Sequence, residues 1–471
     1  MSSYSAVVCK IKTRRHPTAE RIALGDVYGY QVVVGIDTAD GALGVFCPCD
    51  GKLSEAFVTA NDLAPRYDEE HNRIGGGFFE APNYRIRAQK FRGEKSEGYW
   101  FPLWYLTSYG SAATLPIEFF NAVHALKEGD QFTSLGGVEI CSKYETQATR
   151  MAGLANRQKQ PKKSKDNPLF KKHSDTAQFR HESFQIPVGS IVHISLKMHG
   201  TSGRYAFLSE EAPESDKMKK IREEYVKKNG TFLSSLRAFS FERSPSYSWR
   251  NFVGSRNVQL KEGSSGGYYG DDTFRYDVLK KLSGVRKGET VYLEIVGYLP
   301  NGKSIMAKHS NTKLNDKGIV KQYGDTMDYS YGCLDGQNKC FVYRITQTND
   351  DGYVTELTVP QVKARCEEMG VDYVYDFVGP LVVTGKNDSG VTVTGPDASC
   401  NGGSVDLAGL VATLCEGPDP VGLSHVREGV VVRVDAPDGR TYFLKEKGLT
   451  FKILEGIVKD SEDYVDLEES A

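Results

Sequence analysis

The chain has 471 residues, a formal net charge of −2 and 39% hydrophobic residues, which is enough for two or three domains of ordinary globular composition. A net charge this small gives no whole-molecule attraction for a polyanion, so local patches of Lys and Arg must meet any anionic partner. No stretch has the length and apolar character of a signal peptide or a membrane span, so we expect no membrane association and a cytoplasmic location. The nine cysteines are scattered, which predicts free thiols and, if a metal is used, oxygen ligands for it.

The first hundred residues alternate between short apolar runs and turn residues, as in residues 6–11, 30–34, 43–46 and 84–88. This pattern predicts a small β-barrel. Arg85, Arg87 and Arg92 alternate with apolar or aromatic neighbours and precede an aromatic run at 99–101. Two interpretations stay open: a face that binds a nucleic-acid backbone while bases stack on rings, or a solvated strand face over a core.

Between the two domains, residues 117–127 predict one helix, and residues 150–172 contain eight Lys or Arg against a single Asp166. This composition predicts an exposed connector. It could contact phosphates or serve only as a tether.

The second domain begins near Ser174. A strand at 191–194 leads to Lys197, and further strands are predicted at 289–297 and 339–345. Helices are predicted at 216–228, as part of an insertion, and at 271–282 and 361–368, whereas residues 385–417 carry no clear pattern. The acidic residues 460–469 are expected to form a frayed end.

A hairpin is predicted from residues 427–434 and 440–447, with a turn at Asp438-Gly439. Lys445 and Lys447 are two apart, so on a strand both face the same side. Two like charges on one face repel unless an anion lies between them or water screens them. The hairpin therefore predicts a face on which either an anion binds between the two lysines or water screens them.

Several motifs follow one another along the second domain: Lys197-x-His199-Gly200, Ser255-Arg256, Glu294-x-x-Gly297, Tyr343, Glu428-Gly429 and Lys445-x-Lys447. The series, across residues 174–455, resembles the nucleotidyltransferase motifs shared by ATP-dependent RNA ligases, DNA ligases and mRNA capping enzymes. The first domain carries His16-Pro17-x-Ala19-Glu20-Arg21-Ile22, a Gly29-Tyr30-Gln31 run and Arg92-Gly93-x-x-Ser96-x-Gly98. These resemble an OB-type module that precedes the catalytic domain in one group of RNA ligases. DNA ligases and capping enzymes place their OB domain after the final lysine motif.

The resemblance implies a role for each motif. Lys197 would be the nucleophile that takes AMP from ATP, with His199 and Gly200 close to the nucleotide. Lys445 and Lys447 would disfavour the protonated form of Lys197 and stabilise charge on the phosphoryl oxygens. Glu428 would hold Mg²⁺, or Mn²⁺, together with phosphate oxygens.

Other contacts are implied with alternatives. Glu294 would contact the ribose hydroxyls, and Tyr343 would stack on adenine, with Phe341 as its rival. Arg180 and Arg256 are candidates for phosphate contacts, Arg180 toward the nucleotide and Arg256 toward the nucleic acid. Many relatives have Asp in place of His199 and Arg in place of Ser202, with Arg204 the nearest arginine here, so the arginine that contacts the nucleotide is open.

Together these observations predict an α+β protein: an OB-type nucleic-acid-binding module (1–108), a connector with a basic linker (109–173), a nucleotidyltransferase domain of antiparallel sheets with flanking helices (174–456) and an acidic tail (457–471). The predicted function is that of an ATP-dependent RNA ligase, acting as a monomer in RNA repair on RNA or an RNA-containing nicked duplex. The alternatives are a DNA ligase, a capping-type nucleotidyltransferase or a non-catalytic RNA-binding protein.

Overall fold

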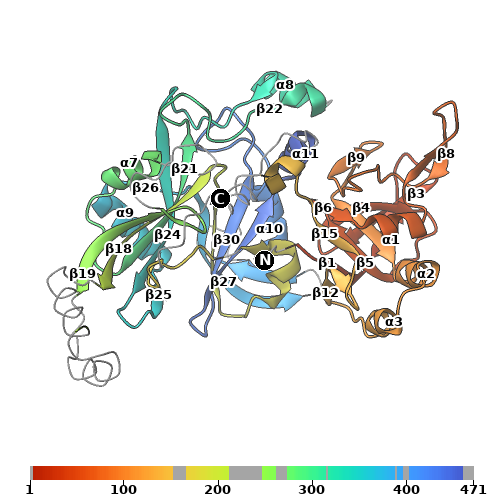
Figure 1. The fold of residues 1–471 in the computed structure, drawn as a ribbon, viewed down its shortest axis with the longest axis horizontal. Helices are drawn as coiled ribbons and strands as arrows, with labels where there is room; N and C mark the ends of the chain where they lie inside the picture. The colour runs from red at the N-terminus through yellow and green to blue at the C-terminus, as the bar shows by residue number, and fades with distance from the viewer. Residues whose placement is uncertain are drawn as a thin grey trace.

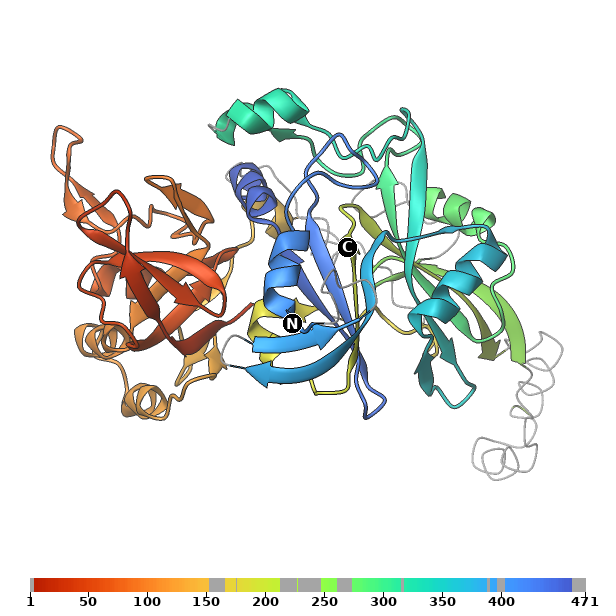
Figure 2. The ribbon, with the colours of Figure 1, turned by 180° about the vertical axis from the view of Figure 1, so that it is seen from behind.

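The computed structural model describes residues 4–151, 166–174, 176–211, 227, 247–260, 273–314, 317–387, 390–395 and 403–459. Most of the predicted basic linker, the helix predicted at 216–228 and the acidic residues 460–469 lie outside these ranges. Within them the fold is mixed, with antiparallel sheets and few helices. The N-terminal part lies at one end of the molecule, beside the first of two large sheets, and the second large sheet lies at the other end (Figures 1 and 2). None of the described helices is long and apolar enough to cross a membrane.

The N-terminal part is built from short strands and short helices. Its main sheet has the order β11-β5-β1-β12, and a second has the order β2-β3-β4. The elements of these two sheets are β1 (Ala6–Lys10), β2 (Lys12–Arg15), β3 (Ile22–Val27), β4 (Tyr30–Gly35), β5 (Leu43–Pro48), β11 (Gly98–Pro102) and β12 (Gln131–Phe132). Its helices include α1 (Glu55–Ala60), α2 (Trp104–Ala112) and α3 (Ile117–His124). Four further strand pairs complete it: β6 (Gly51–Leu53) with β15 (Cys141–Lys143), β7 (Pro65–Tyr67) with β8 (Arg73–Gly76), β9 (Gln89–Phe91) with β10 (Glu94–Ser96), and β13 (Ser134–Leu135) with β14 (Val138–Glu139).

A small β-barrel was predicted here, but the strand pairings among residues 4–151 form separate sheets, with no closed barrel among them. Where β4 approaches β10, side chains bridge the two strands: Gln31 Nε2 donates to the carbonyl of Lys95 at 2.9 Å, and the amide of Val33 donates to Ser96 Oγ at 3.1 Å. The amide of Glu97, the residue that follows β10, also donates to the carbonyl of Gln31 at 2.9 Å, so side chains and this backbone bond join the two strands where no ladder forms. The OB-type assignment therefore stays a prediction.

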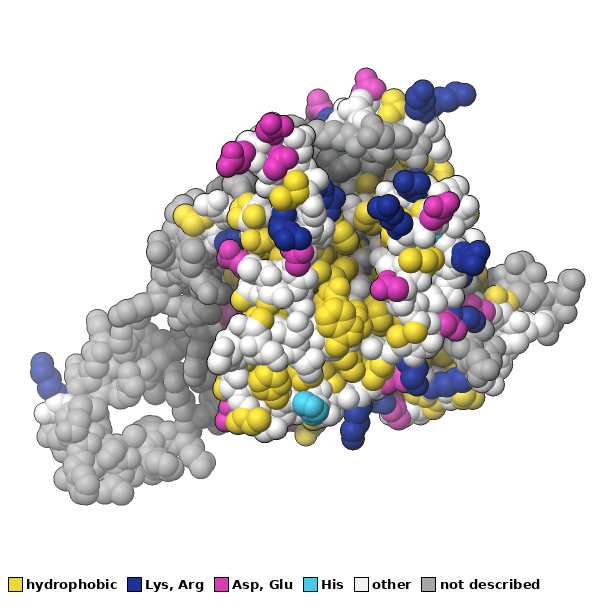
Figure 3. All heavy atoms as spheres, turned by 90° about the vertical axis from the view of Figure 1, so that its right-hand side faces the viewer, with side chains coloured by type: hydrophobic (Ala, Val, Ile, Leu, Met, Phe, Trp, Pro, Cys, Tyr) yellow, Lys and Arg dark blue, Asp and Glu magenta, His cyan; other side chains and the backbone are white. Residues whose placement is uncertain are grey.

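The outer end of the N-terminal part carries a hollow lined by hydrophobic side chains (Figure 3). Phe78, Phe91 and Tyr99 lie in it, with Trp104 and Tyr105 at the start of α2. Trp104 is 61% exposed and Phe78 is 46% exposed. Exposed aromatic rings of this kind are available to a partner.

The first large sheet of the second domain has the order β16-β31-β30-β17-β27-β28-β29. Its strands are β16 (Ala177–Gln178), β17 (Ile191–Lys197), β27 (Asp376–Asn387), β28 (Gly390–Thr394), β29 (Val405–Asp406), β30 (Gly429–Asp435) and β31 (Thr441–Lys447). Val430, Val432 and Val434 of β30 share a buried core with Leu407 and Val411 of α10 (Leu407–Leu414). The short α5 (Phe179–Glu182) and η1 (Ser183–Gln185) precede β17, and α11 (Leu449–Lys459) follows β31.

The second large sheet has the order β20-β19-β18-β21-β24-β25, and β26 pairs with β24. Its strands are β18 (Thr201–Glu211), β19 (Tyr247–Gly254), β20 (Gln259–Leu260), β21 (Glu289–Gly297), β24 (Asn338–Thr348), β25 (Val354–Glu356) and β26 (Asp372–Tyr373). Helices α7 (Thr273–Lys281) and α9 (Val359–Met369) contribute to its core, which contains Phe274 and Val362. The remaining elements are β22 (His309–Ser310), η2 (Asn311–Leu314), α8 (Lys317–Tyr323) and β23 (Thr326–Met327).

Candidate active site

A cavity lies between the two large sheets. The first sheet contributes Ser195 and Lys197 from β17, Val431 and Arg433 from β30, and Phe443 and Lys445 from β31. The second contributes Ser202 from β18, Glu294 from β21, and Tyr343 and Arg344 from β24, and Arg256 follows β19. The cavity thus brings together residues that are far apart in the sequence.

Lys197 is the last residue of β17. It pairs with Gly429 of β30, and its amine donates to Glu428 Oε1 at 2.7 Å. The chain then turns through Met198-His199-Gly200 into β18, the first strand of the chain in the second sheet. The amine therefore lies where the backbone passes from one sheet to the other.

Gly200 makes that passage possible. A Cβ at this position would clash with the carbonyl oxygen of Ile295 and lie 2.8 Å from Val296 Cγ1, both on β21. The sequence predicted that Gly200 allows a close approach to a ligand. Among the described residues, the close approach is to strand β21.

Glu428 lies beside the cavity, in contact with the Lys197 amine, and 1% of its side chain is exposed. Burial alone would raise its pKa, but Lys197, Lys447 and His199 outweigh that effect and lower the pKa to about 2. The distances from Glu428 to Lys447 Nζ and to His199 Nδ1 are both 3.4 Å. Glu428 is therefore an ionised acceptor between two ammonium groups.

His199 is buried against aromatic rings. Its ring centroid lies 4.5 Å from that of Tyr329 and 4.9 Å from that of Phe451 in α11. Its backbone amide donates to the hydroxyl of Tyr331 at 2.8 Å. His199 does not line the cavity, and its contact with Glu428 fits a residue that orients the carboxylate.

The two lysines of the hairpin alternate with Glu446 along β31. Lys445 lines the cavity, and Lys447 donates to Glu455 of α11 at 3.0 Å as well as approaching Glu428. Glu446 faces the other side of the strand, where it is fully buried. The carboxylates of Glu428 and Glu455 thus compensate the charge of Lys447.

The second sheet supplies Glu294 and Tyr343. Glu294 accepts a hydrogen bond from Ser202 Oγ at 3.2 Å. Tyr343 lines the cavity, while Phe341, its rival for base stacking, belongs to the hydrophobic core beneath the sheet and does not line it. A register shift in the pairing of β21 with β24 separates the two positions.

The sequence reasoning missed His173. Its ring nitrogen Nε2 contacts the hydroxyl of Tyr343, and burial, followed by Arg256, lowers its pKa to about 4. The segment that carries it, residues 166–174, packs on the second domain because Arg204 donates to the carbonyls of Ser255 and Lys171 at 2.6 and 2.7 Å. Arg204 is fully buried and holds this segment, and it does not line the cavity. Among the described arginines, those that line the cavity are Arg256, Arg344 and Arg433.

Two predicted contact residues lie elsewhere. Arg180 was expected at the nucleotide, but it donates to the carbonyl of Gly29 at 2.7 Å and pairs with Glu446 at 3.2 Å, on the side of the sheet away from the cavity. Arg85 was expected on a nucleic-acid face, but it is 7% exposed and donates to the carbonyl of Gly456 at 2.9 Å. Both cations join the N-terminal part to the second domain. Arg87 and Arg92 are exposed.

The carboxylate of Glu428 suits a hard cation that binds together with the phosphate oxygens of a substrate. Among the described residues no group of three or more His, Cys, Asp or Glu side chains could hold a metal by itself. Glu428 offers one ionised carboxylate beside the cavity. Mg²⁺ and Mn²⁺ accept few carboxylates when phosphate oxygens and water complete the shell, so Glu428 fits such an ion.

No protein-family model and no curated protein sequence matches the chain. Solved structures do. A mutant of Naegleria gruberi RNA ligase with AMP and Mn aligns with a TM-score of 0.53 and 15% identity over 98% of this chain and 99% of that one. The same ligase with PPi gives 0.52 and 14% over the same shares, and a mutant with ATP and Mn gives 0.53 and 14% over 95% and 98%.

The chain has the fold of an RNA ligase. The alignment includes the N-terminal part as well as the two large sheets, because it extends over nearly the whole length of both chains.

Proposed function

We propose that the protein is an ATP-dependent RNA ligase that joins 5'-phosphate and 3'-hydroxyl ends through a covalent lysyl-AMP intermediate. The observation that carries the proposal is the Lys197 amine, which faces a cavity with Lys445 and lies 2.7 Å from the buried carboxylate of Glu428. This arrangement stands in a fold shared with an RNA ligase that was solved with AMP, ATP, PPi and Mn.

In the first step the Lys197 amine would attack the α-phosphorus of ATP, so that an N–P bond forms and pyrophosphate leaves. The amine must be neutral to attack, and its ion pair with Glu428 favours the charged form. Mg²⁺ or Mn²⁺, when bound to Glu428 and phosphate oxygens, would neutralise phosphate charge and engage that carboxylate. Lys445 is placed to stabilise the charge that develops on the phosphoryl oxygens.

The nucleoside would lie against the second sheet. Tyr343 and Tyr373 are the aromatic rings of that sheet that line the cavity, and we assign adenine stacking to Tyr343, the residue that the motif series implied. Glu294 is the carboxylate placed for the ribose hydroxyls, and Arg256 is the arginine beside Tyr343 for a phosphate. His173 would orient the Tyr343 hydroxyl through their contact.

In the second and third steps AMP would pass to a 5'-phosphate and then be displaced by a 3'-hydroxyl. Every step is phosphoryl transfer, so the protein contributes positioning and charge stabilisation. The N-terminal part would act as the OB-type module that contacts RNA. Exposed Arg87 and Arg92, and the aromatic hollow around Phe78, supply cations and rings for single-stranded RNA.

The test is covalent labelling. Purified protein incubated with ATP labelled at the α-phosphate and with magnesium should become labelled, and Lys197→Ala should not. Labelling with GTP in place of ATP would favour a capping-type transferase, and sealing of nicked DNA but not nicked RNA would favour a DNA ligase. RNA binding with no labelling by any nucleotide would refute the proposal in favour of a non-catalytic RNA-binding protein.

A further inference from the structure

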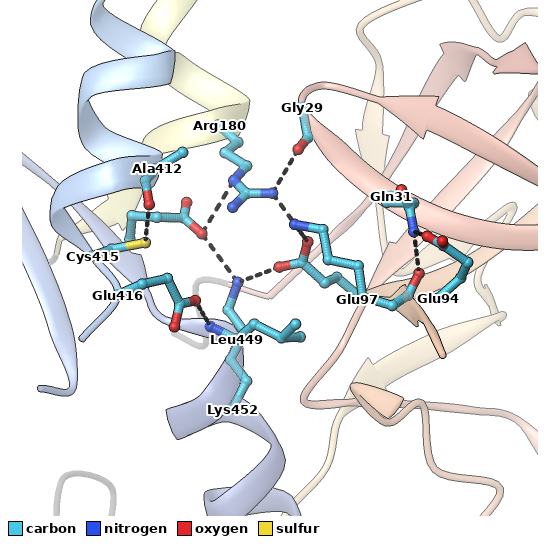
Figure 4. A network of polar contacts seen from close by, with 12 residues as sticks. Gly29, Gln31, Glu94, Glu97, Arg180, Ala412, Cys415, Glu416, Leu449 and Lys452 are labelled. Carbon is cyan, nitrogen blue, oxygen red and sulfur yellow. Dashed lines mark hydrogen bonds and ion pairs between the residues drawn. The ribbon is translucent and has the colours of Figure 1, made fainter. Parts of the chain in front are cut away.

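Four charged side chains meet between the N-terminal part and the second domain, on the side of the first sheet away from the cavity (Figure 4). Two are carboxylates and two are cations, and together they are called the interface cluster: Glu97, Arg180, Glu446 and Lys452. Lys452 Nζ lies 3.3 Å from Glu97 Oε1 and 3.0 Å from Glu446 Oε1. Arg180 lies 3.4 Å from Glu97 and 3.2 Å from Glu446. Each cation therefore bridges the two carboxylates.

The interface cluster is buried. The side chain of Glu97 is 1% exposed and that of Glu446 is fully buried, while those of Arg180 and Lys452 are 11% and 8% exposed. A buried charge is costly unless an opposite charge and hydrogen bonds compensate it. Burial would raise the pKa of Glu97, but Lys452, Arg180 and Lys95 outweigh it and lower the pKa to about 2. Lys95 belongs to the N-terminal part and lies 3.1 Å from Glu97, whereas Lys452 and Arg180 reach Glu97 only when the N-terminal part is docked.

Both cations also lie over one aromatic ring of the N-terminal part. The guanidinium of Arg180 is 4.3 Å from the ring centroid of Tyr30, and Lys452 Nζ is 5.2 Å from it. Arg180 donates to the carbonyl of Gly29 as well. Strand β4 therefore holds the cations of the second domain directly.

The position of Glu446 connects this interface to the cavity. On β31 the side chains alternate between the two faces, so Lys445 and Lys447 point to the active site while Glu446 points to the interface cluster. A shift of Glu446 along or away from the sheet must move both neighbours, because a single peptide unit separates it from each.

Helix α11 makes a second connection. It carries Lys452 of the interface cluster and the carbonyl of Gly456, which accepts a hydrogen bond from Arg85 of the N-terminal part. It also carries Glu455, which pairs with Lys447 at 3.0 Å. The helix thus contacts the N-terminal part and a lysine beside Glu428 at the same time.

We propose that docking of the N-terminal part positions Lys445 and Lys447 for adenylyl transfer, and that the interface cluster transmits this effect as a set of positioning residues. The inference rests on the proposed function. It assigns to the N-terminal part a task in the first chemical step, in addition to any contact with RNA.

The expected effect is on rate more than on nucleotide affinity. Misplacement of a catalytic group by about 1 Å can lower a rate by about 100-fold. The nucleoside contacts proposed for Tyr343 and Glu294 lie on the other sheet and touch no member of the interface cluster. We therefore expect Glu97→Gln to lower the maximal rate of Lys197 adenylylation by about 10- to 100-fold, with less than about a threefold change in the ATP concentration for half-maximal rate.

The experiment is a single-turnover measurement of adenylylation at several ATP concentrations with the full chain. Glu97→Gln is the deciding variant because residue 97 belongs to the N-terminal part and touches nothing in the cavity. Glu446→Gln is a second test variant, which changes the interface-cluster carboxylate on β31. Glu289→Gln is the matched control, since Glu289 is a buried carboxylate that pairs with Arg365 at 2.8 Å on the second sheet. Thermal unfolding of all variants gives the loss of stability.

The proposal is supported if Glu97→Gln and Glu446→Gln lose rate while Glu289→Gln, with a comparable loss of thermal stability, keeps the wild-type rate. A Glu97→Gln variant that labels at the wild-type rate overturns it, as does an equal loss of rate in Glu289→Gln. If Glu446→Gln does not fold, Glu97→Gln alone decides. Absence of labelling in the wild-type protein refutes the proposed function instead, so the two failures are distinguishable.

Discussion

Replacement of Glu428 by Gln should show how strongly the folded protein stabilises the ionised form of this buried carboxylate. The pKa of Glu428 is about 2 in the folded protein, compared with about 4.3 for an unperturbed glutamate. A difference of about two pKa units corresponds to about 3 kcal/mol in favour of folding with the ionised form. A glutamine side chain at this position would resemble the protonated carboxyl, so we expect Glu428→Gln to lower the free energy of unfolding by about 3 kcal/mol at pH 7.

The sign of the pH dependence follows from the direction of the shift. Because the pKa is lower in the folded state, the stabilisation is complete above about pH 4.3 and is lost as the pH falls toward 2. Urea unfolding of the wild type and the variant at pH 7 and pH 3 should therefore show a difference that falls to about half at pH 3.

A surface carboxylate provides the control. Glu128 pairs with Lys10 at 3.0 Å, but both side chains are at least half exposed. Glu128→Gln should change the free energy of unfolding by about 1 kcal/mol or less. A Glu428→Gln variant as stable as the wild type at pH 7, or a difference that does not change between pH 7 and pH 3, would refute the reasoning.

Three further outcomes are expected. Tyr343→Ala should weaken ATP binding by about 10- to 100-fold, since stacking on a base contributes about 1–3 kcal/mol. Tyr343→Phe keeps the ring and should bind ATP within about threefold of the wild type. Equal losses of affinity in the two variants would exclude stacking. Gly200→Ala should lower the thermal unfolding temperature, because its Cβ would clash with the carbonyl of Ile295, at a cost of about 1–3 kcal/mol; an unchanged temperature would contradict the packing seen there. Arg92→Ala should reduce the slope of the logarithm of the binding constant for single-stranded RNA against the logarithm of the salt concentration by about 0.7. Arg85→Met should leave that slope unchanged because Arg85 is buried. The opposite result would place the RNA face elsewhere.

The strands of the second domain were predictable from local pattern. The strand predicted at 289–297 is β21 with the same bounds, and the predicted hairpin is β30 and β31 around Asp438-Gly439. Alternation at Lys445 and Lys447 placed both on one face, as the structure has them. Such features depend on nearest neighbours in the chain and on the two-residue period of a strand, which the sequence carries directly.

Other features depend on contacts between distant segments, and there the predictions were wrong or absent. Arg85 was expected on a nucleic-acid face and Arg180 at the nucleotide, yet each is covered by the other half of the molecule. His173 reaches the cavity because contacts with distant residues, among them those of Arg204, hold its segment on the second domain. The nearest local signal for His173 was a basic stretch that fits a tether equally well, so a sequence pattern alone could not place it.

The division of the site between two sheets separates what its parts can do. Lys197, Gly429 and Lys447 are paired across three adjacent strands, β17, β30 and β31, so backbone hydrogen bonds fix the spacing of the nucleophile and the cations. The second sheet carries the groups assigned to the nucleoside, and the cavity depends on the spacing of the two sheets at the turn of Met198-His199-Gly200. Changes in that spacing should alter nucleotide affinity first. Changes at the interface cluster act on β31 from its other face, and they should alter the rate of the chemical step while the nucleotide still binds.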